Sequence, residues 1–369
     1  MKKTLLYIIF AVAFILSGCD VHEFPESPYF PDSSDKVEFP DLPDKPGDQT
    51  GKDDPLMAKL CVRLNYDTHL TMWDHLYDGN SVIENGLGNV YDSSVGTGQM
   101  RYVIHAIPVS KERGVQTSVA QEYQFTKDVT EGYDSEFVVE VPSGEYDIMV
   151  WSDFVQESEI VYYVGDFSGI MLEEESSIGD DSSDAFRGMT PIQLSVDLKD
   201  NQVDTVDVAM QRPMAKFEFV ANDLPEFAEK VANLESATKS GADLSVDISD
   251  YKVRFYYVGF KPDVYSMYSD KPVDSSLGVT FESTMSQLSN SEVKIGFDYV
   301  FVGDQSTAVT LQVGVFDDED TRISLTKPIT VPLMRGRHTV LTGAFLTPNA
   351  SQGVQINPEY DGDHNFILP

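Results

Sequence analysis

The feature that most constrains this chain is an alternation of apolar and polar residues, with a period of two, that recurs along most of its length. The first run has apolar side chains at every second position, namely Ala58, Leu60, Val62, Leu64 and Tyr66. Successive side chains of a β-strand point to opposite faces, so such a run predicts a half-buried strand. Similar runs lie at 137–141, 146–150, 215–219 and 309–315. Many short strands of this kind predict a mainly β fold built from β-sandwiches.

A helix, a loop and a domain boundary are expected within this β framework. Asp223 can cap a helix, with Glu226 completing a capping box and apolar residues following at 227, 231 and 234. The segment 173–184 has six acidic residues and four serines, so it is expected to form a surface loop. We place the boundary at Arg212-Pro213, which gives a first sandwich over 56–211 and a second over 212–369.

Residues 1–19 have the order of a bacterial lipoprotein signal. Lys2 and Lys3 precede an apolar run from 5 to 16, which is too short to span a bilayer comfortably and suits a signal-peptide core. The run ends in Leu16-Ser17-Gly18-Cys19, which resembles the lipobox in which a cysteine receives diacylglycerol before cleavage. The resemblance implies a signal peptide at 1–18 and acyl chains, palmitate among them, on Cys19. Such chains would anchor the protein in the outer membrane.

The segment that follows, 19–55, is expected to be a tether. Residues 20–55 contain seven prolines and eleven acidic residues against three lysines. Proline removes backbone donors and like charges repel each other, so we expect an extended spacer between the membrane and the first sandwich. Asp20 and Glu23 resemble the acidic flank that directs some lipoproteins of Gram-negative anaerobes to the cell surface.

The charge of the chain excludes two classes of partner. Lys and Arg number 26 and Asp and Glu number 61, which gives a net charge of −35. Phosphate backbones would repel such a chain, so nucleic-acid binding is excluded. Binding to anionic lipids through a basic patch is excluded for the same reason.

Sequence motifs for catalysis are missing. The chain has no Gly-x-Ser-x-Gly elbow, no His-Glu-x-x-His and no phosphate-binding loop. Gly86-Leu87-Gly88 is expected in a loop and has no lysine to bind phosphate. Cys61 has cationic neighbours in the sequence but no histidine placed to make it a nucleophile. We therefore expect no enzymatic activity and no cofactor.

Metal-ligand patterns are weak. His69 and His75 are six residues apart, a spacing that suits neither face of a strand nor of a helix, and they are expected in an exposed loop. The segment 361–365 imitates the opening of a calcium loop but lacks the glycine at its sixth position. Asp180 and Asp181 are neighbouring acidic residues, and water can stabilise their charges without a bound cation. No metal site is expected.

Six phrases, taken in order after the lipobox, resemble a known family. They are 142–146 (PSGEY), 150–155 (VWSDFV), 212–219 (RPMAKFEF), 296–301 (GFDYVF), 331–339 (VPLMRGRHT) and 341–343 (LTG). The pattern is similar to that of the fimbrillin-like lipoproteins of Gram-negative anaerobes, the FimA/FimB-type superfamily of type V fimbriae. The resemblance implies two tandem transthyretin-like β-sandwich domains and a structural or adhesive role without catalysis.

The resemblance also implies how such a protein would act. Fimbrial stalk subunits are trimmed by an arginine-specific protease, whereas here the first arginine after Cys19 is Arg63, inside a predicted strand. This favours an anchor or accessory subunit that joins other fimbrial subunits by edge-strand pairing. The tail 348–369 would either pair with its own domain or be lent to a neighbouring subunit. The alternative function is a glycan-binding surface lipoprotein with exposed aromatic platforms at Trp73, Tyr77 and Tyr91, its ligand unspecified.

Overall fold

A computed structural model describes residues 56–92, 98–109, 121–129, 133, 135–156, 159–172, 178–195, 203–238 and 247–348. Within these residues the chain is mainly β, as the alternation predicts, with one α-helix and two short 3-10 helices. The expected signal peptide, the tether, Cys19 and the tail from 349 onward lie outside the described residues. The described strands belong to one compact unit, Asp54–Pro369.

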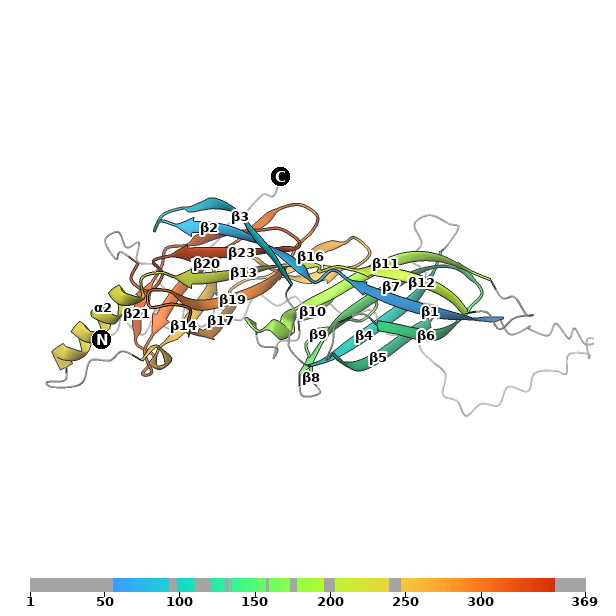
Figure 1. Ribbon diagram of the computed structural model, residues 1–369, viewed down its shortest axis with the longest axis horizontal. Coiled ribbons are helices and arrows are strands. Elements are labelled where there is room, and N and C mark those ends of the chain that lie inside the picture. The colour runs from blue at the N-terminus through green and yellow to red at the C-terminus, as the bar shows by residue number, and fades with distance from the viewer. Residues whose placement is uncertain are drawn as a thin grey trace, which may run out of the picture. The chain divides into compact units, whose positions relative to one another are not determined.

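The first sandwich packs a three-stranded sheet against a five-stranded sheet (Figure 1). The smaller sheet has the order β12 (Val203–Met210), β1 (Met57–Tyr66) and β6 (Ser135–Pro142). The larger has the order β11 (Ala185–Leu194), β7 (Gly144–Gln156), β4 (Gly98–Pro108) and β5 (Gln121–Val129), with β8 (Glu159–Ile160) on β7. Their inward side chains form one continuous apolar core that includes Leu60, Tyr102 and Phe186.

The second sandwich packs a six-stranded sheet against a five-stranded one. The first has the order β18 (Ser286–Gln287), β19 (Val293–Phe301), β13 (Met214–Ala221), β23 (Arg337–Gly343), β2 (His69–Tyr77) and β3 (Val82–Asp92). The second has the order β17 (Thr280–Thr284), β14 (Lys252–Tyr257), β20 (Thr307–Phe316) and β21 (Arg322–Leu325), with β22 (Ile329–Leu333) also on β20. Phe217, Phe219 and Phe255 lie at the centre of its core.

A four-stranded sheet joins strands from both halves of the sequence. Its order is β16 (Lys271–Ser276), β15 (Lys261–Ser266), β10 (Ile170–Leu172) and β9 (Tyr162–Tyr163). Tyr162, Tyr265 and Phe301 pack with Trp151 in a separate apolar cluster on its inner side. Trp151 therefore fills a core, and this core is shared by the two sandwiches.

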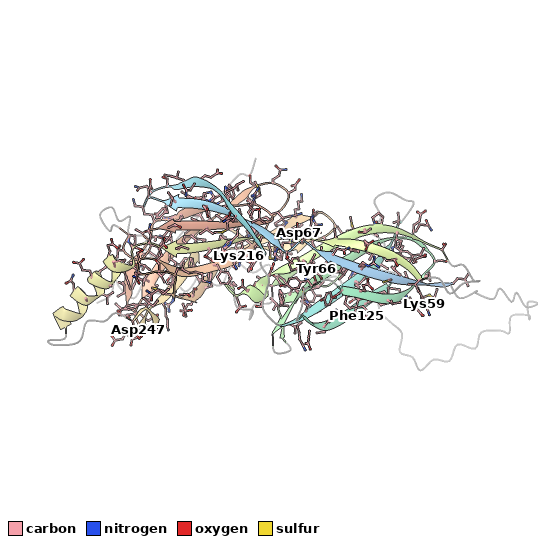
Figure 2. The ribbon with its side chains drawn as sticks, in the orientation of Figure 1. Lys59, Tyr66, Asp67, Phe125, Lys216 and Asp247 are labelled. Atoms are coloured by element: carbon pink, nitrogen blue, oxygen red, sulfur yellow. The ribbon has the colours of Figure 1, made fainter. Side chains whose placement is uncertain are left out.

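Sheet membership departs from the expected boundary at 212. We expected 56–211 to form the first sandwich, yet β2 and β3 lie in the second, where β2 runs parallel to β23. Only Asp67 and Thr68 separate β1 from β2, and Figure 2 labels this junction at Tyr66 and Asp67. Alternation predicts that a strand exists but not which sheet it joins, because any uncovered edge can accept it. The division into domains stays a prediction.

Three local predictions can be compared with the structure. The expected helix is confirmed as α2 (Leu224–Thr238), while the carboxylate of Asp223 accepts the backbone N–H groups of residues 346 and 347. The acidic segment ends in the 3-10 helix η1 (Asp181–Ser183) rather than in a solvated loop, and Asp184 after it is buried in an ion pair. Cys61 is buried although its neighbours Lys59 and Arg63 are exposed. A second 3-10 helix, η2, spans Ile248–Asp250.

Candidate functional site

The β2–β3 hairpin forms one edge of the six-stranded sheet and carries the candidate site. Its turn, Asp78–Ser81, closes because Asp78 Oδ1 accepts the backbone N–H groups of Asn80 (2.9 Å) and Ser81 (2.8 Å). These hydrogen bonds also lower the pKa of the Asp78 carboxyl group. Gly79 has a φ of +93°, a conformation that side chains with a Cβ rarely adopt.

Gly86 and Gly88 lie inside β3, so the expectation of a loop at Gly86-Leu87-Gly88 is wrong. The register between β2 and β3 shifts twice in this stretch, which marks two irregularities in the ladder. Gly86 has a φ of +119°, and a Cβ on Gly88 would come within 2.9 Å of Asp74 Oδ2. Glycine in a strand commonly marks a bulge, and here both glycines permit β3 to bend while it stays paired.

Side chains that pair across the hairpin share one of its faces. On the face toward β22 the pairs are Tyr77–Val82, His75–Glu84, Trp73–Leu87 and Thr71–Val90. Near the turn this face is buried, since Tyr77 stacks on Phe345 in the core with ring centroids 5.4 Å apart. At the far end it is uncovered, with Leu87 59% and Val90 58% exposed. The same face thus changes from core to surface along the hairpin.

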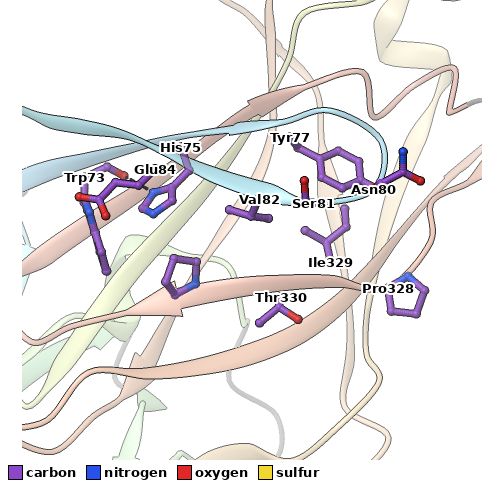
Figure 3. Close-up of a pocket in the computed structure, with 11 residues that line it drawn as sticks. Trp73, His75, Tyr77, Asn80, Ser81, Val82, Glu84, Pro328, Ile329 and Thr330 are labelled. Carbon is purple, nitrogen blue, oxygen red and sulfur yellow. Dashed lines mark hydrogen bonds between the residues drawn. The ribbon is translucent and has the colours of Figure 1, made fainter.

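A cavity of about 480 Å³ opens where this face leaves the core (Figure 3). Trp73, His75 and Glu84 line it from the hairpin. Pro328 and Pro332, before and within β22, line it from the opposite sheet. The cavity therefore has an aromatic wall, an aliphatic wall and polar groups between them.

Hydrogen bonds orient the polar groups of the cavity. His75 Nδ1 lies 3.0 Å from the carbonyl oxygen of Trp73, and the two rings meet edge to face at 4.7 Å. In a neutral imidazole this makes Nδ1 the donor and leaves Nε2 as an acceptor. Asn80 Oδ1 accepts a hydrogen bond from Lys327 Nζ (2.9 Å), which leaves the amide N–H groups of Asn80 as donors.

The other edge of β3 has no strand beside it among the described residues. β3 is 11 residues long and pairs with β2 alone in that part of the chain. An unpaired strand edge presents a row of backbone N–H and C=O groups that can pair with another strand. Together with exposed Leu87 and Val90, this edge is the clearest candidate for an interaction surface.

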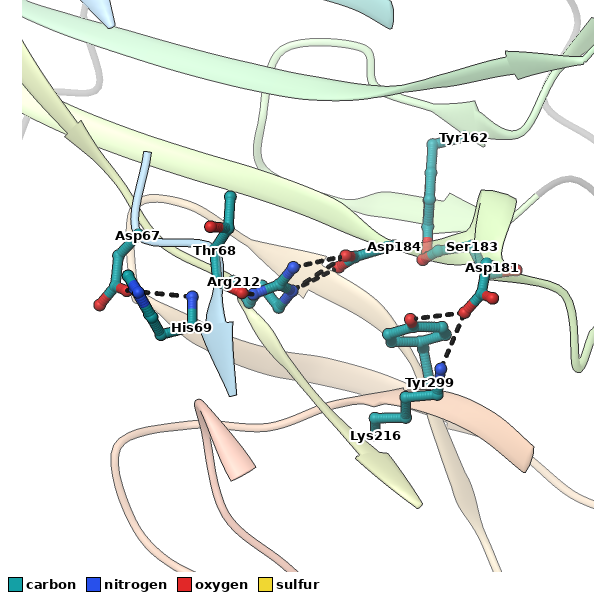
Figure 4. A network of polar contacts seen from close by, with 10 residues as sticks. All are labelled: Asp67, Thr68, His69, Tyr162, Asp181, Ser183, Asp184, Arg212, Lys216 and Tyr299. Atoms are coloured by element: carbon teal, nitrogen blue, oxygen red, sulfur yellow. Dashed lines mark hydrogen bonds and ion pairs between the residues drawn. The ribbon is translucent and has the colours of Figure 1, made fainter. Parts of the chain in front are cut away.

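A polar network fixes the start of the hairpin to the first sandwich (Figure 4). Arg212 pairs with Asp184 and donates from Nη1 to the carbonyl oxygen of Thr68 (2.8 Å), just before β2. Asp181 accepts hydrogen bonds from Lys216 Nζ (2.8 Å) and Tyr299 OH (2.9 Å). Elements of both sandwiches thus meet at η1. The residue just before β2, Thr68, is held there by its hydrogen bond with Arg212.

The aromatic platform expected at Trp73, Tyr77 and Tyr91 is only partly present. Trp73 is half-buried and lines the cavity, but Tyr77 is buried, so its predicted exposure is wrong. Tyr91 pairs with Leu70 through β3, and its side chain lies outside the described residues. All three lie on strands and not in loops. The cavity itself could not be seen in the sequence, because Pro328 and Pro332 are some 250 residues from Trp73.

The candidate metal ligands do not come together. His69 and His75 are both on β2, where His69 is exposed and bound to Asp67 while His75 is buried. Within the described ranges no three His, Cys, Asp or Glu side chains are grouped so that they could hold a metal ion. The segment 361–365 lies outside those ranges. In the same part of the chain no helix has the length and apolar character needed to cross a bilayer.

Residues 80–369 match the model of a family described as a family of unknown function (DUF6562). Among solved structures, the chain is similar to the fimbrial anchor protein Mfa2 from Porphyromonas gingivalis at 10% identity. That alignment covers 73% of this chain and 82% of Mfa2, with a TM-score of 0.36. It is also similar to the C-terminally truncated tip fimbrial protein Mfa3 from the same organism at 8% identity, over 75% and 81% of the two chains, with a TM-score of 0.34. No curated protein matches the sequence. Both of these solved structures are of fimbrial proteins, which is the class that the six sequence phrases resemble.

Proposed function

Since the chain belongs to the DUF6562 family, whose members have no assigned role, we propose from its own residues that it is a cell-surface lipoprotein that assembles with fimbrial or adhesin subunits. It would act as a structural, anchor or accessory subunit and would not be an enzyme. The single observation that carries this proposal is the edge of β3 that no described strand pairs with, together with its uncovered apolar side chains.

Strand addition is the mechanism that this edge supports. A partner strand laid along β3 would form backbone hydrogen bonds, which give affinity without regard to sequence. Leu87 and Val90 would cover apolar side chains of the incoming strand and so set its register. Soluble proteins usually protect such edges with charges or prolines, and β3 has Glu84 and Asp92 only toward its ends.

The membrane end of the proposal rests on the sequence. Cys19 would carry the lipid that holds the protein on the outer membrane, exposed at the cell surface. The acidic, proline-rich segment 20–55 would let the folded part stand away from the lipid. The edge of β3 could then reach subunits that are not themselves anchored.

The experiment changes the edge without changing the core. In the double variant Leu87→Lys and Val90→Lys, two exposed apolar side chains become charged, as in edges that resist pairing. We expect the variant to keep its thermal unfolding midpoint but to be lost from surface fibres sheared from cells and probed by immunoblot. The matched control is Leu277→Lys, because Leu277 is 64% exposed and lies outside the strands.

The outcome distinguishes assembly from simple display. If the double variant enters fibres as well as the Leu277→Lys control does, the β3 edge has no part in assembly. If the double variant and the Leu277→Lys control are both lost from the cell surface, the cause is a folding or export defect. The comparison is therefore made at equal surface amounts, measured by labelling intact cells.

A further inference from the structure

We propose that the cavity lined by Trp73, Glu84 and Pro332 binds a neutral saccharide of one or two pyranose rings. The inference goes beyond strand addition, because it assigns a ligand to the cavity on the face of the hairpin and not to the backbone edge of β3. It rests on the shape, the hydrogen-bonding groups and the charge of the cavity lining.

The apolar walls suit the flat C–H faces of a sugar ring. Trp73 is half-buried, so part of its indole stays open to the cavity while the rest is held by the hairpin. Pro332 lines the cavity from the opposite sheet with a rigid aliphatic ring that loses little conformational freedom on binding, whereas Pro328 lies at the other end of the cavity, beside Ile329 (Figure 3). An indole and a proline ring that line the same cavity offer two apolar surfaces for the C–H faces of a pyranose ring.

The polar groups of the cavity lining suit a ligand that is rich in hydroxyl groups. Glu84 supplies carboxylate oxygens, which only accept hydrogen bonds, and Nε2 is the ring nitrogen of His75 that does not contact the carbonyl oxygen of Trp73. The amide N–H groups of Asn80 remain as donors because Lys327 already occupies Oδ1. A sugar hydroxyl both donates and accepts, so one ligand class satisfies both kinds of group.

The charge of Glu84 disfavours acidic sugars, although Lys327 Nζ lies 2.9 Å from Oδ1 of the lining residue Asn80. Glu84 is the only formally charged side chain that lines the cavity, and the whole chain has a net charge of −35. A uronic or sialic acid would bring a second carboxylate next to Glu84, and like charges in a partly desolvated site repel each other. A neutral ligand has no charge for Glu84 to repel.

Size and chemistry point to binding without hydrolysis. The volume of about 480 Å³ falls in the range of about 300–1,000 Å³ that is typical of small-molecule sites. Glycoside hydrolysis commonly requires two carboxyl groups on either side of the scissile bond. Glu84 is the only carboxylate that lines this cavity, so the site can hold a sugar but lacks the second carboxylate that hydrolysis requires.

The two tryptophans of the chain make the test direct. Trp151 is fully buried in the shared core, whereas Trp73 lines the cavity, so a ligand there changes the emission of Trp73 alone. The protein from 20 to 369 is titrated with lactose, cellobiose and N,N′-diacetylchitobiose, and with digalacturonate as the acidic probe. We expect saturable binding of at least one neutral disaccharide and none of digalacturonate.

Variants locate the binding by calorimetry, which does not depend on tryptophan emission. Trp73→Ala should weaken binding by about tenfold or more through loss of the stacking wall. Glu84→Gln keeps the shape of the side chain and should weaken binding of the neutral sugar by a smaller factor. Leu76→Ala is the matched control, because Leu76 is exposed on β2 but is not part of the cavity lining, and it should bind normally.

Three results would overturn the proposal: no neutral disaccharide binds, binding survives Trp73→Ala, or digalacturonate binds as well as the neutral sugars. Loss of fibre incorporation in Trp73→Ala without any sugar binding would make the cavity part of the strand-addition surface, which also overturns it. Sugar binding by the folded Leu87→Lys and Val90→Lys variant would show that the two surfaces are independent. If that variant stays folded but does not bind sugar, the cavity and the β3 edge are not independent.

Discussion

Arg212 and Asp184 form a buried ion pair in which the guanidinium group approaches both carboxylate oxygens. Nε lies 2.8 Å from Oδ1 and Nη2 lies 2.8 Å from Oδ2, and the two side chains are 2% and 0% exposed. Burial disfavours the charge on Arg212, but the charge and hydrogen bonds of Asp184 outweigh it and raise the pKa of the guanidinium group. Arg212 also lies over the Phe186 ring at 4.5 Å. The pair therefore joins η1, the start of β13 and the β1–β2 junction.

Removing one member of this pair should be costly. Arg212→Met leaves Asp184 buried without a counter-charge, and breaking a buried pair in this way costs about 3–5 kcal/mol. We expect a loss of that size in the free energy of unfolding, measured by urea denaturation. The double variant Arg212→Met and Asp184→Leu removes both charges and should recover much of it. A double variant as unstable as the single one would show that the loss comes from packing and not from the stranded charge.

A second prediction concerns the close approach of β11 and β12, which closes the first sandwich. A Cβ on Gly188 would lie 2.6 Å from Val208 Cγ1 and 2.7 Å from the carbonyl oxygen of Ala209. Backbone cannot move as freely as a side-chain end, so Gly188→Ala should cost about 1–3 kcal/mol. Gly259→Ala is the control, because nothing lies within 4 Å of its Cβ position. Equal unfolding midpoints for the two variants would contradict the crowding.

The sequence predicted the strands better than their partners. The run from Ala58 to Tyr66 became β1, and the apolar spacing after Asp223 became α2, because both patterns depend on residues close together in the chain. The carboxylate of Asp223 itself binds residues 346 and 347, which no local capping pattern predicts. The parallel pairing of β2 with β23 joins residues some 265 positions apart, and no local pattern encodes it. The glycines at 86 and 88 suggested a loop, although a strand can keep them as bulges.

The candidate site was visible only in fragments. The sequence predicts Trp73 as part of an exposed aromatic platform, but Pro328 and Pro332, which line the cavity from the other sheet, have an ordinary composition for a turn and a strand. Asp184 looked like part of a solvated acidic run, since nothing in that run points to Arg212 28 residues later. Buried ion pairs of this kind need the tertiary fold before either charge can be recognised as paired.

A third prediction is that acid weakens the fold through His338 on β23. Burial lowers its pKa to about 3, and the charges of Lys216 and Lys294 add to this while Asp181 opposes it. Glu218 faces the same ring, with Oε2 3.6 Å from Nε2. The unfolded chain binds this proton near pH 6.5, whereas the folded chain does not, so stability is lost as the pH falls below 6.5.

The size of the effect follows from that difference in pKa. Relative to pH 8, the His338 contribution at pH 5 should be a loss of about 2 kcal/mol. The measurement is the free energy of unfolding at both pH values for the natural chain and for His338→Gln, in which this proton cannot bind. The carboxylates are common to both proteins, so their contributions largely cancel. The same pH dependence in both proteins would mean that His338 titrates normally in the folded state.

The last prediction tests the lipid anchor, and the chain provides its own control because it has two cysteines. Cys19 follows Leu16-Ser17-Gly18 in the lipobox-like segment, whereas Cys61 is buried in β1. Cells grown with labelled palmitate should label the natural protein and the Cys61→Ala variant, but not Cys19→Ala. Because several acyl chains on one residue are needed for durable anchoring, Cys19→Ala should also leave the membrane pellet and appear in the soluble fraction. A Cys19→Ala protein that keeps its label, or stays in the pellet after a high-salt wash, would contradict the assignment of Cys19 as the lipid attachment site.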